Sequence, residues 1–297
     1  MKHLTALGII LATLLALPGS GHAATMAEVI AASSPKEWRA IDPKTTLVMT
    51  LVNGGEVLIE LAPNFAPNTT KNILGLAQRG YFDGLVILRV QDNYVTQWGD
   101  PAAGSPGARS QGGIAPTLAP EWTRPRKGLD FSVLKDGDVY AREVGISHGM
   151  PAARDKRAAW LTHCYGMVGV GRDSAPDSGN GSELYVVIGH SPRHLDRNIT
   201  LAGRVIMGME NLAALPRGSG ALGFYQGTEQ RLGIRSVRIS AQLPGDGPAA
   251  RLEALREDSK SFAALTDARR NRTDDWTKVK AGKIEICNVP LPVRVRP

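Results

Sequence analysis

Apolar and polar residues alternate along the segment that follows residue 45. Every second residue is apolar from Leu47 to Leu51 and again from Val57 to Leu61, and Asn53-Gly54-Gly55 lies between the two runs. Alternation places one set of side chains on one face of a strand, and a glycine-containing turn joins neighbouring antiparallel strands. We therefore predict a hairpin with one buried face.

Helical spacing replaces this alternation between Ala66 and Gly80. Pro67 would lie in the first turn, where a proline loses no helical hydrogen bond, and Ile73, Leu76 and Ala77 would share one face. A second helix is predicted to open at residues 208–210. Its inward-facing residues would be Met209, Leu212 and Ala213.

Short strands are predicted at 85–88, 94–97 and 234–239, where apolar residues are concentrated or alternate. Between them, residues 101–163 show a different pattern. Its first part is a loop rich in glycine, proline, serine and alanine, followed by a possible hairpin from Leu129 to Val144 and a second excursion from Met150 to Trp160. Disorder is the alternative for this region, but Phe131, Val133 and Trp160 favour some packing.

Short helices and a strand are also predicted near the two ends of the chain, at residues 34–38 and beyond residue 244. Ser34 can cap a short helical turn that begins at Pro35, and Trp38 would pack this segment onto the body of the chain. Beyond Pro244, Asp246 can cap a helix that begins near Pro248, and Lys283–Val289 would form a strand. The apolar stripe of that helix would pack on the body or, alternatively, on a partner, and it comprises Leu252, Leu255, Phe262 and Leu265.

The first 23 residues are typical of a secretory signal peptide. Lys2 and His3 precede an apolar run from Leu4 to Leu17, and small residues lead to a plausible cleavage site after Ala23. A membrane anchor is the alternative, but this run is shorter than the about 20 apolar residues that span a bilayer. The mature protein is therefore expected to be periplasmic, with no stable membrane insertion after cleavage.

The chain has two cysteines, Cys164 and Cys287. An even number of cysteines in an exported protein favours a disulfide, and two buried free thiols are the alternative. A catalytic pair of Cys164 with the adjacent His163 is disfavoured, because neighbouring residues of a strand point to opposite faces. Three histidines, His148, His163 and His190, lack the spacing of metal ligands and are interpreted as surface or packed residues.

Composition narrows the class of protein without identifying it. The chain has 297 residues, of which 42% are hydrophobic and 21% charged, as in folded globular proteins. Its formal net charge is +7, but no run of lysine and arginine is interleaved with stacking aromatic residues. Nucleic acid is therefore not an expected partner. The length suits one domain with additions or two small domains.

One stretch carries the most specific signal, from Tyr81 to Asp100, with the sequence YFDGLVILRVQDNYVTQWGD. It resembles the characteristic stretch of the cyclophilins, a family of peptidyl-prolyl cis/trans isomerases. The residues that match the family pattern at the same spacing are Arg89, Asn93, Gln97, Gly99 and Asp100.

The resemblance extends from Thr46 to about Leu243, apart from the insertion at 101–163. It includes Ala66–Ile73, Asn180–Ile188, Leu195-Asp196 and Leu201–Val205. It implies a mainly β fold, a closed eight-stranded barrel capped by two helices. Residues 24–45 would then form an entry segment, and residues 244–297 a C-terminal extension of helix and strand packed on the barrel.

The family resemblance also implies the chemistry. Rotation about a prolyl amide must overcome a barrier of about 18–20 kcal/mol but makes and breaks no covalent bond, so no metal or other cofactor is expected. Arg89 would stabilise the twisted amide, because its guanidinium stays charged and has a rigid set of donors. Gln97 would support the substrate backbone. Proline-containing polypeptides would be the partners, and the protein is expected to be a monomer.

Further site residues follow from their matching positions. The proline pocket would be lined by Tyr94, Val95, Tyr185 and Leu195, and the peptide groove by Val170, Gly171 and Arg172. Glu183 replaces a glutamine of the family, and a salt bridge from it to Arg89 would compete with catalysis. His194 occupies the place of an aromatic residue, which disfavours tight cyclosporin binding.

The residues favour one of three functions. An active isomerase is favoured because Arg89 and Gln97 are both present. The alternative is a cyclophilin-like module that binds proline-containing segments without isomerising them. For Arg89 itself, the alternative is a structural role as a snorkelling or salt-bridged residue. A hydrolase has no supporting group of residues, since the chain contains no Gly-x-Ser-x-Gly elbow.

Overall fold

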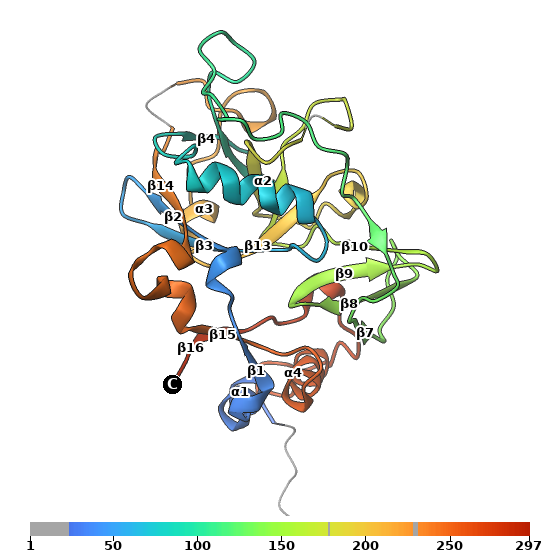
Figure 1. Ribbon diagram of the computed structural model, residues 1–297. Coiled ribbons are helices and arrows are strands. Elements are labelled where there is room, and N and C mark those ends of the chain that lie inside the picture. The colour runs from blue at the N-terminus through green and yellow to red at the C-terminus, as the bar shows by residue number, and fades with distance from the viewer. Residues whose placement is uncertain (1–23, 178, 228–230) are drawn as a thin grey trace, which may run out of the picture.

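The computed structural model describes residues 24–177, 179–227 and 231–297. The expected signal peptide lies outside these ranges. A β-barrel crossed by a helix occupies one side of the molecule, and a smaller sheet lies beside it with two further helices beneath (Figure 1). No helix of the described ranges is long and apolar enough to cross a membrane.

Eight antiparallel strands form the barrel, in the order β14-β2-β3-β13-β11-β12-β5-β4. The first and last strands of this order meet through backbone hydrogen bonds, from Gly84 N to Ile234 O at 2.8 Å and from Ile234 N to Leu85 O at 2.7 Å. The barrel is therefore nearly closed. The strands are β2 (Thr46–Leu51), β3 (Glu56–Leu61), β4 (Val86–Val90), β5 (Val95–Gly99), β11 (Met167–Val170), β12 (Leu184–Val187), β13 (Leu201–Met207) and β14 (Ile234–Ile239).

The two predicted helices pack against the barrel interior. Helix α2 (Pro67–Gln78) has its proline in the first turn and buries Ile73 and Leu76 in the barrel core, as expected from their spacing. Helix α3 (Glu210–Ala213) has a single turn, and its Leu212 is fully buried. The predicted hairpin is β2–β3, which confirms the strand pattern before and after the turn.

The prediction of one buried face for this hairpin is wrong, because its outer face is covered too. Val48 and Leu58 pack against residues of the entry segment and the C-terminal extension. Three short strands from these segments form a separate sheet in the order β1-β15-β16. They are β1 (Trp38–Ala40), β15 (Leu252–Leu255) and β16 (Val293–Val295).

The insertion folds into a second sheet with the order β6-β10-β9-β8-β7. The predicted hairpin after Leu129 is present, since β7 pairs with β8 in antiparallel register. Trp160 and Ile146 of this sheet share a hydrophobic core with Phe262 of the extension, and α1 (Met26–Ala32) lies beside α4 (Lys260–Arg270) below it (Figure 1). The strands are β6 (Arg124–Pro125), β7 (Ser132–Leu134), β8 (Glu143–Ser147), β9 (Met150–Arg154) and β10 (Ala158–Leu161).

The predicted secondary structure of the extension is wrong in two places. The expected helix near Pro248 is a 3₁₀ turn followed by β15, and α4 starts only after Ser259, whose hydroxyl accepts from Phe262 N at 3.0 Å. Leu252 and Leu255 belong to β15 because that strand pairs on both sides, with β1 and with β16. The expected strand at 283–289 contains a 3₁₀ turn, Ile286–Asn288, in which Glu285 accepts a hydrogen bond from Cys287 N at 2.8 Å.

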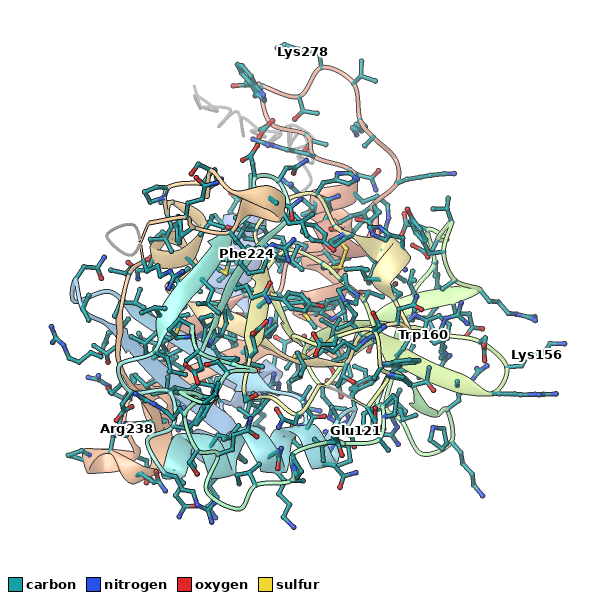
Figure 2. All side chains as sticks on the ribbon, turned by 90° about the horizontal axis from the view of Figure 1, so that it is seen from above. Glu121, Lys156, Trp160, Phe224, Arg238 and Lys278 are labelled. Carbon is teal, nitrogen blue, oxygen red and sulfur yellow. A yellow bond between two sulfur atoms is a disulfide. The ribbon has the colours of Figure 1, made fainter. Side chains whose placement is uncertain are left out.

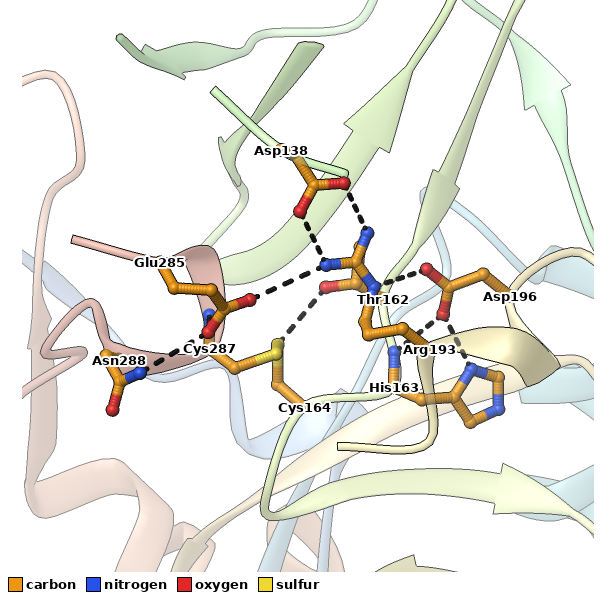
Figure 3. Close-up of a disulfide and its surroundings, with 9 residues drawn as sticks. All are labelled: Asp138, Thr162, His163, Cys164, Arg193, Asp196, Glu285, Cys287 and Asn288. Atoms are coloured by element: carbon orange, nitrogen blue, oxygen red, sulfur yellow. Dashed lines mark hydrogen bonds and ion pairs between the residues drawn. A yellow bond between two sulfur atoms is a disulfide. The ribbon is translucent and has the colours of Figure 1, made fainter. Parts of the chain in front are cut away.

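The predicted disulfide is present between Cys164 and Cys287, which are 123 residues apart in the chain. It joins the segment before β11 to the extension, beside a group of buried charged side chains (Figure 3). Both cysteines of the chain are used in this bond.

Removing the disulfide with Cys164→Ser and Cys287→Ser together should lower the free energy of unfolding by about 4–5 kcal/mol, because the unfolded chain is no longer constrained by a long closed loop. Urea unfolding measures this loss. Reductant should destabilise the wild type to a similar extent and leave the double variant unchanged. Equal wild-type midpoints with and without reductant would contradict the prediction.

Candidate active site

Register between neighbouring strands places three polar side chains in one row on the outer face of the barrel. Arg89 of β4 pairs with Gln97 of β5, and Gln97 pairs with Tyr185 of β12. Residues at paired positions point to the same face of a sheet. The next residues along the strands point the other way, so Trp98 and Val186 are buried in the barrel core.

A β-bulge sets the position of Arg89 in this row. The β4–β5 register shifts between Ile87, which pairs with Trp98, and Arg89, which pairs with Gln97. The extra residue is Leu88. Bulges redirect side chains and are frequent beside active sites. Without this one, Leu88 would lie opposite Gln97.

The row borders a small pocket of about 100 Å³ on the barrel surface. Two larger hollows, of about 520 and 670 Å³, lie against the insertion and the extension. Size does not identify the site, because the small pocket alone of these three contains the Arg89–Gln97–Tyr185 row. Its lining residues are Arg89, Tyr94, Val95, Gln97, Val170, Gly171, Arg172, Tyr185, Leu195 and Ile199.

Three hydrogen bonds hold the Arg89 guanidinium at the pocket. Nη1 donates to Gln97 Oε1 at 3.0 Å, Nε donates to Leu222 O at 2.6 Å, and Nη2 donates to Gln91 Oε1. The Arg89 Cζ atom lies 5.5 Å from the ring centre of Tyr94 and 5.4 Å from that of Phe224. Cation–π attraction to both rings restrains the group further.

Burial shifts the pKa values of Arg89, Tyr94 and Tyr185 so as to favour the neutral form of each group. It lowers the pKa of Arg89, which still remains charged at neutral pH, and it raises the pKa of Tyr94. Burial also raises the pKa of Tyr185 well above its usual value. The pocket is therefore lined by two permanently charged arginines, Arg89 and Arg172, beside neutral phenols.

Glu183 forms no salt bridge with Arg89 in the described structure. Its Oε1 instead accepts a hydrogen bond from Gln97 Nε2, so the amide of Gln97 lies between the carboxylate and the guanidinium. Burial raises the pKa of Glu183, although the bond from Gln97 acts in the opposite direction. Arg89 is thus oriented by a neutral amide.

A model of the cyclophilin type peptidyl-prolyl cis-trans isomerase/CLD family matches residues 46–238, which include the whole pocket and all of the barrel strands except the last residue of β14. The chain belongs to the cyclophilin family. This cyclophilin is similar to the crystal structure of AquaCyp293 from Hirschia baltica, with a TM-score of 0.68 and 26% identity over 92% of this chain and 99% of that one. That likeness extends beyond the barrel into the flanking segments.

Two curated relatives are named for peptidyl-prolyl cis-trans isomerase activity. One from Brucella suis biovar 1 is 26% identical over 182 residues, which are 61% of this chain and 76% of the relative. Another from Streptococcus pyogenes serotype M6, also named for phosphatase activity, is 38% identical over 68 residues, which are 23% of this chain. The matched part spans only 14% of that Streptococcus protein.

Most of the expected site residues come together in this cyclophilin, and two do not line the pocket. His194 lies in the 3₁₀ turn Arg193–Leu195 with its side chain exposed, while Leu195 faces the pocket. His194, expected to contribute to substrate binding, is not among the residues that line the pocket. Glu183 reaches the pocket only through Gln97.

A loop beyond β13 supplies contacts that the sequence motifs do not indicate. Leu222 adopts a left-handed conformation at φ 56° and presents its carbonyl to Arg89. Phe224 forms an isolated β-bridge with Arg89 and lies beside the barrel strands, apart from the inserted sheet that carries Trp160 (Figure 2). The positive φ of a leucine is an energetically costly conformation that is often found at functional sites.

Glu183→Gln should stabilise this cyclophilin at pH 7. Because burial raises the pKa of Glu183, its contribution to stability is present below the usual value of 4.5 and is lost as the pH rises through the raised pKa. The urea midpoint of the Glu183→Gln variant should therefore exceed that of the wild type by an amount that grows as the pH rises from 4 to 8. The exposed Glu210→Gln is the control, and a constant difference across this range would refute the assignment.

Proposed function

We propose that this cyclophilin is a peptidyl-prolyl isomerase of exported proteins, in which Arg89 stabilises the twisted amide of an X-Pro bond. One observation carries the proposal, the guanidinium of Arg89 bonded to Gln97 at 3.0 Å at the edge of the pocket. A guanidinium has five N–H donors, and three are used by Leu222, Gln97 and Gln91. Two remain without a hydrogen-bond partner among the described residues, where Arg89 forms no ion pair with a carboxylate.

The apolar part of the pocket suits a proline ring. Val95 and Tyr185 are buried on adjacent strands and share a small cluster with Val187, and Leu195 closes the pocket from the 3₁₀ turn. A ring held there leaves the preceding carbonyl free to rotate. Val170, Gly171 and Arg172 would receive the rest of the peptide along β11.

Twisting the amide breaks its resonance and frees the lone pair of the proline nitrogen. A donor that bonds this nitrogen only when the amide is twisted lowers the barrier without stabilising the ground state. One charge-assisted bond contributes about 1.5–3 kcal/mol, which corresponds to roughly one to two orders of magnitude in rate. Exclusion of water and orientation of the peptide would supply the rest.

Export of the protein rests on the N-terminal segment and is supported by the disulfide. Disulfides persist in oxidising compartments such as the bacterial periplasm. We therefore place the protein in the periplasm, with unfolded or partly folded exported chains as its substrates.

Arg89→Ala should reduce kcat/KM for cis/trans exchange of an alanyl-prolyl peptide by about 10-fold to 100-fold or more, because the transition-state donor is lost. Arg89→Lys should restore only part of the rate, since a lysine keeps the charge but not the rigid fork. NMR exchange spectroscopy measures both.

The matched control is Arg235→Ala, an exposed arginine of β14 that donates to Val52 O and does not line the pocket. It should leave the rate unchanged. Wild-type activity should be nearly flat from about pH 6 to 8, because no acid or base titrates in the mechanism. Binding of the peptide without Arg89-dependent exchange would instead favour a binding module.

A further inference from the structure

A chain of buried polar side chains runs from the pocket into the core behind it. The hydroxyl of Tyr185 lies 2.9 Å from Nε2 of His163, and Nδ1 of His163 lies 3.0 Å from Asp196 Oδ1. Asp196 Oδ2 accepts from Arg193 Nε at 2.6 Å, and Arg193 donates two bonds of 3.0 Å to Asp138. Figure 3 shows this chain from Asp138 to His163.

The acceptors in this chain determine where its protons lie. Asp196 Oδ1 accepts from the backbone N of His163 at 3.0 Å, so the same oxygen is the natural acceptor for Nδ1–H of the ring. In that tautomer Nε2 is an acceptor, and it would accept from the hydroxyl of Tyr185. The hydroxyl is directed at His163, which does not line the pocket, so a substrate meets the ring of Tyr185 and not its polar end.

The Tyr185 ring is held by its surroundings on several sides. A Cβ atom at Gly169 would lie 2.2 Å from Cζ of Tyr185, so the ring packs directly on the glycine backbone. The His163 ring lies nearly parallel to it, at 11° and 6.3 Å between centres. His163 itself is fully buried. Packing thus restricts the Tyr185 ring to one position, and the hydrogen bond to His163 fixes it there.

The far end of the chain belongs to the insertion. Asp138 lies in the loop between β7 and β8, and its side chain is only 3% exposed. Glu285, two residues before Cys287, adds a carboxylate 3.6 Å from Arg193. No residue of the β7–β8 loop lines the pocket, yet this loop supplies a buried charge that orients Arg193.

We propose that Asp138, Arg193, Asp196 and His163 are positioning residues that hold Tyr185 as a wall of the proline pocket, so that the insertion sets substrate affinity. This inference rests on the proposed function. A wall that contacts the proline ring does so equally before and during rotation of the amide. Its loss should therefore raise KM and leave kcat nearly unchanged, in contrast to the loss of Arg89.

The same loop offers a matched control. Asp136 does not line the proline pocket. It accepts two hydrogen bonds of 2.7 Å from Arg270 of α4, and its side chain is 6% exposed. Asp136→Asn and Asp138→Asn thus weaken comparable bidentate pairs from one loop. We expect Asp138→Asn to raise KM for an alanyl-prolyl peptide about threefold to tenfold. Asp136→Asn should leave KM and kcat at wild-type values.

A double-mutant cycle tests the connection itself. Tyr185→Phe keeps the ring but removes the bond to His163, so it should also raise KM with little change in kcat. Adding Asp138→Asn to Tyr185→Phe should then raise KM no further. The inference is overturned if Asp138→Asn matches Asp136→Asn in KM, or if the two KM effects multiply. Should Asp138→Asn fail to fold, an unchanged KM in Tyr185→Phe overturns it alone.

Arg89→Ala in the same assay separates this inference from the proposed function. Turnover that depends on Arg89 supports an isomerase whatever the KM of the Asp138 variant. If the wild type shows no turnover, the proposed function fails, and the dissociation constant of the peptide from NMR titration replaces KM in the same comparison. Absence of peptide binding as well would refute both.

Discussion

Alignment of Arg89 with Gln97 across β4 and β5 is the constraint on which the site depends. The bulge at Leu88 places the arginine opposite the amide, and the 3.0 Å bond between them fixes the guanidinium at the edge of the pocket. The same register sends Ile87 and Trp98 into the barrel core. Burial of these large side chains therefore holds the row in place, because a shift of one residue would turn them out to water.

The guanidinium is restrained without being neutralised. Its partners are two amide oxygens and one backbone carbonyl, and Glu183 is held away by its bond to Gln97. A carboxylate paired directly with the guanidinium would compensate the positive charge that stabilises the twisted amide. Two aromatic rings restrict the group further while leaving its edge open. This arrangement fits a donor that acts on the substrate, in contrast to a structural ion pair such as Glu60 with Arg204.

The insertion and the extension form one supporting unit. Their shared core contains Trp160, Ile146 and Phe262, and the disulfide joins the extension to the segment that carries His163. Much of this unit could not be predicted from the sequence, because its order comes from contacts between distant segments. The tail residues Leu252 and Leu255 have helical spacing but form a strand with two partners. Local patterns were reliable for the β2–β3 hairpin and α2, where neighbouring residues determine the structure.

Motifs identified most of the pocket because its residues occupy fixed positions on barrel strands. They did not indicate the Leu88 bulge, the carbonyl of Leu222, or the buried role of His163, which was interpreted only as a surface or packed residue. Each of these depends on backbone geometry or on a partner far away in the chain; Leu222 is 133 residues from Arg89. The exposed position of His194 likewise follows from the geometry of a single turn.

A crystal structure with a bound alanyl-prolyl peptide tests the central claim most directly. The account predicts a proline ring against Val95, Tyr185 and Leu195, with an Arg89 Nη atom within hydrogen-bond distance of the prolyl amide. A peptide bound in another hollow, or an Arg89 side chain turned away from the amide, would contradict it.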